Sequence, residues 1–128
     1  MLMRKVIIES PFMRNKTRTQ EQHEHYARLA VRDAVLRGEA PIASHLLLTQ
    51  KGILNDDVPE ERTLGIEAGL AWMDCAEASI FYTDCGWSSG MIAALKRCQA
   101  KEGYLIEFRS IFESSCYPPW TLNYINSK

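Results

Sequence analysis

Short apolar runs alternate with segments of helical periodicity along most of this chain. The runs at residues 6–8, 41–48, 78–83 and 104–108 are read as strands, and the segments at 19–37, 57–74 and 88–103 as helices. Strands that alternate with helices pair in parallel through right-handed crossovers, which place helices on both faces of the sheet. The sequence therefore predicts a small α/β domain with a doubly wound, flavodoxin- or Rossmann-like parallel sheet of four to five strands, in the order 2-1-3-4.

The length of 128 residues fits one domain with its own hydrophobic core. We assign residues 1–109 to this domain. Residues 110–128 form an aromatic C-terminal tail, which is expected to pack on the domain or on a neighbouring subunit.

Charge and composition exclude several classes of function. The 15 Lys and Arg residues are balanced by 16 Asp and Glu residues, so no basic field favours polymeric DNA or RNA. The apolar runs are too short to span a bilayer, and no signal peptide is evident, so a cytoplasmic protein without membrane contact is expected. The four cysteines form no CxxC motif, and neither a metal nor a cofactor is predicted.

The most informative local motif lies between the third predicted strand and the third predicted helix. The strand ends at Asp84, and the helix opens with two potential capping hydroxyls, Ser88 and Ser89. A helix N-terminus carries unpaired N–H groups and partial positive charge, which suit a phosphate or sugar oxygen. The nucleotide-binding residues predicted here are Gly86, Trp87, Ser88, Ser89, Gly90 and Met91. The alternative is an ordinary helix cap.

A second loop follows the first predicted strand. It contains Ser10, Pro11 and Phe12. In a doubly wound sheet of this order, ligands bind outside the carboxyl ends of the strands where the winding reverses, between the first and third strands. The two loops should therefore lie side by side and form one site.

Several motifs in order resemble the nucleoside 2-deoxyribosyltransferase-like superfamily, in particular its small members, many of them encoded by bacteriophages. They are IIESPF at 7–12, GEAPIASHLL at 38–47, PEERTLGI at 59–66 and YTDCGWSSGM at 82–91. The resemblance implies a doubly wound fold, a nucleoside or nucleotide ligand, and exchange or cleavage of the N-glycosidic bond by a glutamate nucleophile. It also implies an oligomer whose subunits complete one another's pockets.

The chain departs from this pattern where the superfamily has its catalytic glutamate. Residues 92–95 are Ile, Ala, Ala and Leu, and none can act as a carboxylate nucleophile. Asp84 is the first candidate to replace it, and Glu9, Glu61 and Glu67 are less direct ones. His45 is the candidate for acid–base chemistry, because its ordinary pKa suits proton transfer; the alternative is a structural hydrogen bond.

Three functions stay open. The first is an enzyme that acts on the N-glycosidic bond of a nucleoside or nucleotide. The second is a non-catalytic binder that sequesters a signalling nucleotide, as a phage counter-defence protein would. The third is a protein-interaction module with a vestigial site. In each case a homo-oligomer is expected.

Overall fold

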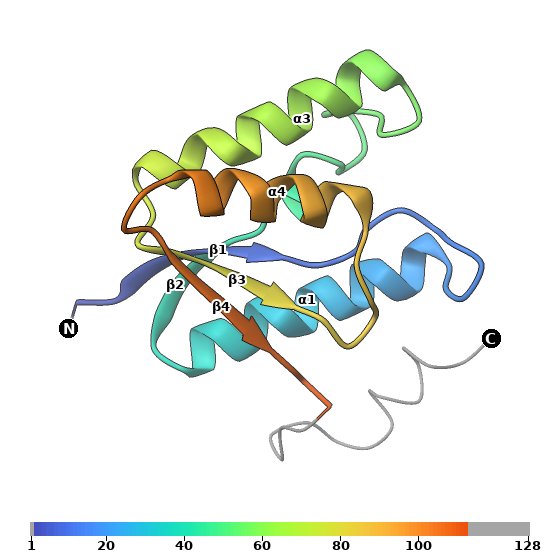
Figure 1. Ribbon diagram of the computed structural model, residues 1–128. Helices are drawn as coiled ribbons and strands as arrows, with labels where there is room; N and C mark the ends of the chain where they lie inside the picture. Colours follow the sequence, from blue (N-terminus) through green and yellow to red (C-terminus); the bar gives the residue numbers. More distant parts are fainter. Residues whose placement is uncertain (1, 113–128) are drawn as a thin grey trace.

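The computed structural model describes residues 2–112 and contains one four-stranded sheet. All strands are parallel, in the order β2-β1-β3-β4 (Figure 1). The strands are β1 (Arg4–Glu9), β2 (Glu39–Ile42), β3 (Ala78–Tyr82) and β4 (Leu105–Arg109). The helices are α1 (Gln20–Leu36), α2 (Ser44–Leu47), α3 (Pro59–Ala71), a 3-10 turn (Trp72–Asp74) and α4 (Ser89–Ala100). The predicted doubly wound fold and strand order are confirmed.

Alternation along the strands divides the core into two layers. Val6 and Ile8 of β1 point to the face that α1 covers, whereas Ile7 points to the face covered by α3 and α4 (Figure 1). Every residue of β3 is buried, which fits its central place in the sheet. Within residues 2–112, no helix has both the length and the apolar character needed to cross a membrane.

The prediction of one strand over residues 41–48 is wrong. The strand β2 ends at Ile42, and the chain turns at once into the short helix α2, in which the N–H groups of Leu46 and Leu47 donate to the carbonyl of Ala43 at 3.1 and 3.0 Å. A short apolar run fits a buried strand and a buried helix equally well by pattern alone. The consequence is functional, because α2 carries His45 towards the carboxyl end of β1.

The core extends beyond the predicted domain boundary at residue 109. Ile111 is fully buried beside α1, and the ring of Phe112 meets Tyr26 edge-on with 6.3 Å between the ring centroids. The rest of the predicted aromatic tail, residues 113–128, lies outside the described residues.

The helices α2 and α3 approach each other closely at Gly69. A Cβ atom at this position would overlap Ser44 Oγ and lie 3.0 Å from Ser44 Cβ. Rotation of the hydroxyl relieves only the first of these contacts. Glycine at residue 69 therefore lets α2 lie against α3.

We predict that Gly69→Ala destabilises the protein and lowers its melting temperature, although alanine favours a helix by about 0.8–1.0 kcal/mol over glycine. Gly65→Ala in the same helix is the control, because its Cβ would meet only the end of the Leu54 side chain, at 3.4 Å. Ser44→Gly should restore stability to the Gly69→Ala protein. An equal gain in stability for both alanine variants would contradict this account of the packing.

Candidate functional site

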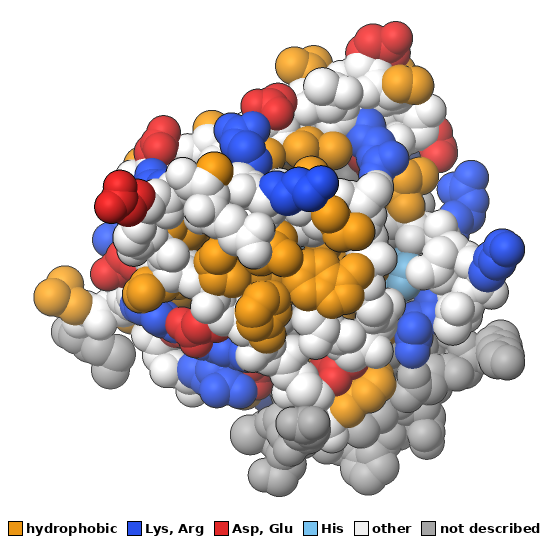
Figure 2. Space-filling model, viewed as in Figure 1, with side chains coloured by type: hydrophobic (Ala, Val, Ile, Leu, Met, Phe, Trp, Pro, Cys, Tyr) orange, Lys and Arg blue, Asp and Glu red, His pale blue; other side chains and the backbone are white. Residues whose placement is uncertain are grey.

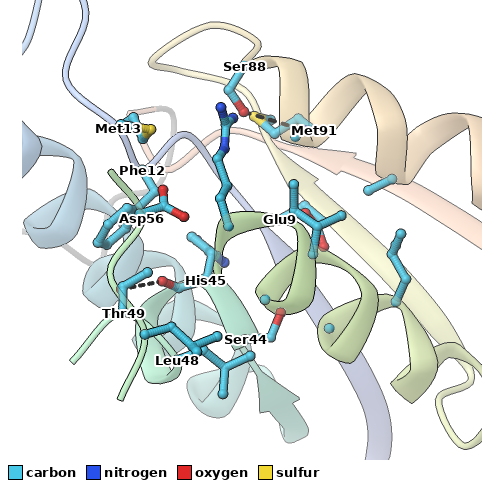
Figure 3. A pocket seen from close by; sticks show the side chains of 18 of the residues that line it. Glu9, Phe12, Met13, Ser44, His45, Leu48, Thr49, Asp56, Ser88 and Met91 are labelled. Carbon is cyan, nitrogen blue, oxygen red and sulfur yellow. Dashed lines mark hydrogen bonds between the residues drawn. The ribbon is translucent and has the colours of Figure 1, made fainter. Parts of the chain in front are cut away.

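A cavity of about 100 Å³ lies at the carboxyl end of β1, between α2, α3 and α4. Of the predicted site residues, Ser10, Phe12, His45, Ser88, Gly90 and Met91 line it. Figure 3 shows Glu9, His45 and Ser88 around the same space, although they come from three different parts of the fold. The predicted convergence of the first loop and the start of α4 is confirmed.

Glu9 supplies a carboxyl group to this cavity from the last position of β1. It stands opposite Phe81 in the β1–β3 register and therefore points, like Ile7, to the face of α3 and α4. No hydrogen bond to another described residue stabilises its charged form. Burial raises the pKa of Glu9 to about 8. The carboxyl group is therefore mostly protonated at neutral pH and can donate a proton.

His45 lies next to the end of β1 and is held by Ser10. Ser10 Oγ and His45 Nε2 share a hydrogen bond of 2.8 Å, and the Phe12 ring meets the imidazole edge-on at 6.2 Å. Burial lowers the pKa of His45 to about 4, so the ring is neutral at neutral pH. Its Nδ1 atom is buried and has no partner among residues 2–112. A polar ligand atom would satisfy it.

Arg62 of α3 brings a positive charge to the same cavity. Its Nη2 atom donates to Ser89 Oγ at 3.1 Å, at the first turn of α4. The N-cap of α4 is Ser88, whose Oγ accepts from the N–H of Met91 at 3.2 Å. Of the two serines predicted as capping hydroxyls, Ser88 caps the helix and Ser89 contacts Arg62.

Two larger hollows of about 490 and 460 Å³ lie beside the inner cavity and share part of its wall. Asp56 lines the cavity and both hollows, and Arg62 lines the cavity and the larger hollow. Burial raises the pKa of Asp56, although the nearby Arg62 acts in the opposite direction. Glu9 and His45 are therefore uncharged in the inner cavity at neutral pH. Arg62 and Asp56 lie where the cavity borders the larger hollows.

Asp84, the predicted nucleophile, does not line the cavity. It continues the alternation of β3 on the α1 side, where its carboxylate accepts hydrogen bonds from Tyr26 Oη at 2.6 Å, the N–H of Ile111 at 2.7 Å, and Ser110 Oγ. These contacts tie α1 and the segment after β4 to the end of β3. The arrangement gives Asp84 a structural role.

The other predicted binding residues lie outside the inner cavity. Trp87 stacks on Phe81 with 5.4 Å between ring centroids and an interplanar angle of 24°, and it does not line the cavity. Gly86 has a φ angle of +85°, which provides the turn after β3. Pro11 is absent from the cavity wall, and Ser89 lines the larger of the two outer hollows.

Sequence reasoning did not single out Arg62 or Asp56. The signal for Arg62 is the face that it shares with Gly65 and Gly69, because two glycines at helical spacing indicate close approach of another segment. The signal for Glu9 is the alternation of residues 6–9, which places Glu9 on the face of Ile7. Asp56 lies in a loop, and no pattern predicts its direction.

The raised pKa of Glu9 predicts how stability depends on pH. The ordinary pKa of glutamate is 4.5 and that of Glu9 is about 8. Between these values the unfolded chain releases a proton that the folded chain keeps, so the free energy of unfolding falls as pH rises through this range. Glu9→Gln should remove this part of the fall, as measured by urea unfolding at several pH values. Parallel pH curves for the two proteins would contradict the raised pKa.

The contacts of Asp84 predict that its removal destabilises the fold. Asp84→Ala leaves the N–H of Ile111 and the Tyr26 hydroxyl without their acceptor, which should cost about 1–3 kcal/mol in free energy of unfolding. Asp74→Ala is the control, because its side chain is mostly exposed and pairs only with Lys101. Equal stability of the two variants, measured by denaturant unfolding, would contradict a structural role for Asp84.

The comparisons with known proteins give one match. No curated protein and no solved structure matches the sequence. The family model described as "Domain of unknown function (DUF7768)" matches residues 4–108. This range covers most of the chain, including strands β1 to β3, all of β4 except Arg109, and every residue of the cavity wall. The chain therefore belongs to the DUF7768 family.

Proposed function

We propose that this protein binds a nucleoside or nucleotide in the cavity at the end of β1 and cleaves its N-glycosidic bond. The observation that carries the proposal is the position of the Glu9 carboxyl group in the cavity wall, where burial raises its pKa to about 8. Departure of a nucleobase requires a proton, and a carboxylic acid with a raised pKa can supply it at neutral pH. The resemblance to nucleoside 2-deoxyribosyltransferases supports the same chemistry.

Hydrolysis needs a second group that activates water. In this mechanism Glu9 protonates the leaving base as the bond between C1′ and nitrogen breaks, and water adds to C1′ while its proton passes to the carboxylate of Asp56. The proton then returns to Glu9 through solvent, so the net reaction consumes one water. Enzymes that cleave glycosidic bonds usually use a pair of carboxyl groups with separate roles.

Arg62 and the first turn of α4 support a ligand with an anionic substituent. The Arg62 guanidinium group and the first turn of α4 lie where the cavity borders the larger hollow. Both attract negative charge. In this proposal the sugar lies at Glu9, His45 and Asp56, and the phosphate lies at Arg62, the one positively charged side chain among the described residues of the cavity wall.

The second candidate function is a nucleotide binder without catalysis. This function is favoured by the composition of α4. Met91 and Ala94 line the cavity, and the first turns of α4 contain no carboxylate. In this case the ligand would leave the protein unchanged, and Glu9 would serve as a hydrogen-bond donor to it.

We predict that the protein releases free base from at least one member of a panel of nucleosides and nucleoside monophosphates, detected by liquid chromatography. The rate should fall as pH rises through about 8, where Glu9 loses its proton. Glu9→Gln should lower kcat by about 10²- to 10⁴-fold, the usual contribution of a general acid.

Glu67→Gln is the matched control, because Glu67 lies on the exposed side of α3 and pairs with Arg97. It should keep the parent rate. Binding of a nucleotide without any product would favour the second candidate. A panel in which nothing binds and nothing is cleaved would contradict both.

A further inference from the structure

The strand β4 forms one edge of the sheet, and no described strand pairs with its outer side. Figure 2 shows apolar side chains gathered over β4 and the adjacent side of α4. Phe108 of β4 is 58% exposed, and Trp87, which precedes α4, is 42% exposed. Exposed apolar surface beside an open strand edge is typical of a protein interface.

The exposed rings at this edge are held in a defined arrangement. The ring centroid of Phe108 lies 5.8 Å from that of Phe81 and 5.9 Å from that of Trp87, while Trp87 stacks on Phe81. Phe81 is fully buried, so the cluster joins the core to the surface. The edge therefore presents a rigid aromatic face.

The backbone of β4 shows which residues can bond to a further strand. The carbonyl of Arg109 accepts from the N–H of Thr83 at 3.2 Å and so points towards β3. The N–H and C=O groups of one strand residue point to the same side, and the side alternates along the strand. Phe108 and Ile106 therefore direct their backbone groups to the open edge.

We propose that a second copy of this chain pairs with β4 in antiparallel orientation, around a two-fold axis at Phe108. An axis at this residue makes Phe108 and its counterpart a hydrogen-bonded pair, which needs the outward backbone groups described above. The pairing would extend two four-stranded sheets into one of eight strands and cover both aromatic clusters.

Charge complementarity selects this register. With the axis at Phe108, Glu107 of each copy stands opposite Arg109 of the other, on the same face of the sheet. Each group is already paired within its own chain, since Arg109 binds Glu39 at 2.7 Å and Glu107 at 3.3 Å, and Arg4 binds Glu107 at 2.6 Å. The contact across the axis would extend this network of ion pairs. An axis at Glu107 would place the two negatively charged Glu107 side chains opposite each other. The backbone groups of Glu107 also point towards β3 and cannot bond to a second copy. An axis at Ile106 would place Glu107 opposite Leu105.

Sedimentation equilibrium and a pair of arginine variants test the proposal. The parent chain should have twice the mass of the 14.6 kDa monomer at micromolar concentration. Phe108→Arg should be monomeric, because it places two positive charges together at the axis. Leu64→Arg, at an equally exposed position on α3, should stay dimeric. Melting curves confirm that both variants are folded.

Cysteine cross-linking tests the register independently, with Cys75 and Cys116 replaced by serine. Phe108→Cys should form a disulfide-linked dimer on mild oxidation, because hydrogen-bonded pairs have Cα atoms about 5.5 Å apart. Ile106→Cys on the same face of β4 should not, since the two copies of that residue are far from the axis.

Three results would overturn the proposal: a monomeric parent chain, a dimer that survives Phe108→Arg, or equal cross-linking at residues 106 and 108.

Discussion

The burial of the Glu9 carboxyl group in the cavity wall is the constraint on which the proposed chemistry of this protein depends. The group stands at the end of β1 and faces the layer formed by α3 and α4, and burial raises its pKa to about 8. A buried carboxyl group without a charged partner lowers the free energy of unfolding at pH values above the ordinary pKa of glutamate. A fold that needed only stability would gain from glutamine there. The proposed function gives this carboxyl group a role in the cavity, whose wall it shares with Ser10 and the neutral His45.

The two faces of the sheet have separate tasks. The α1 face holds the polar network that stabilises the fold: Asp84 accepts from Tyr26 and Ile111, and Tyr82 Oη donates to Asp33 at 2.6 Å. The other face holds the cavity. Since side chains alternate along a strand, a carboxylate at the end of β3 and one at the end of β1 reach opposite faces although both strands end at the same edge. Glu9, and not Asp84, therefore lies in the cavity wall.

The sequence predicts the architecture of this chain more closely than its site. Long periodic helices and β-branched runs predict the strand order, and the order alone brings the first loop beside the start of α4. The short helix α2 was missed because four residues carry too little periodic signal to separate it from the preceding strand. The sequence favours Asp84 because it follows a buried strand and precedes the start of a helix. Alternation places Glu9 and Asp84 on opposite faces of the sheet, but only the folded structure shows which face holds the cavity. Arg62 of α3 and His45 of α2 line the same cavity, and Gly69 lets these two helices lie close together, a contact between segments far apart in the sequence.

The central claim is that Glu9 is a protonated acid at neutral pH inside the cavity. Its most direct test is an NMR titration of the side-chain carboxyl carbons, with the Glu9 resonance assigned by comparison with Glu9→Gln. The account predicts that this resonance titrates with a pKa of about 8, well above that of the other glutamates. A Glu9 resonance that titrates at the ordinary value of 4.5 would contradict it, because the carboxylate would then be charged at neutral pH and have no proton to donate to a leaving base.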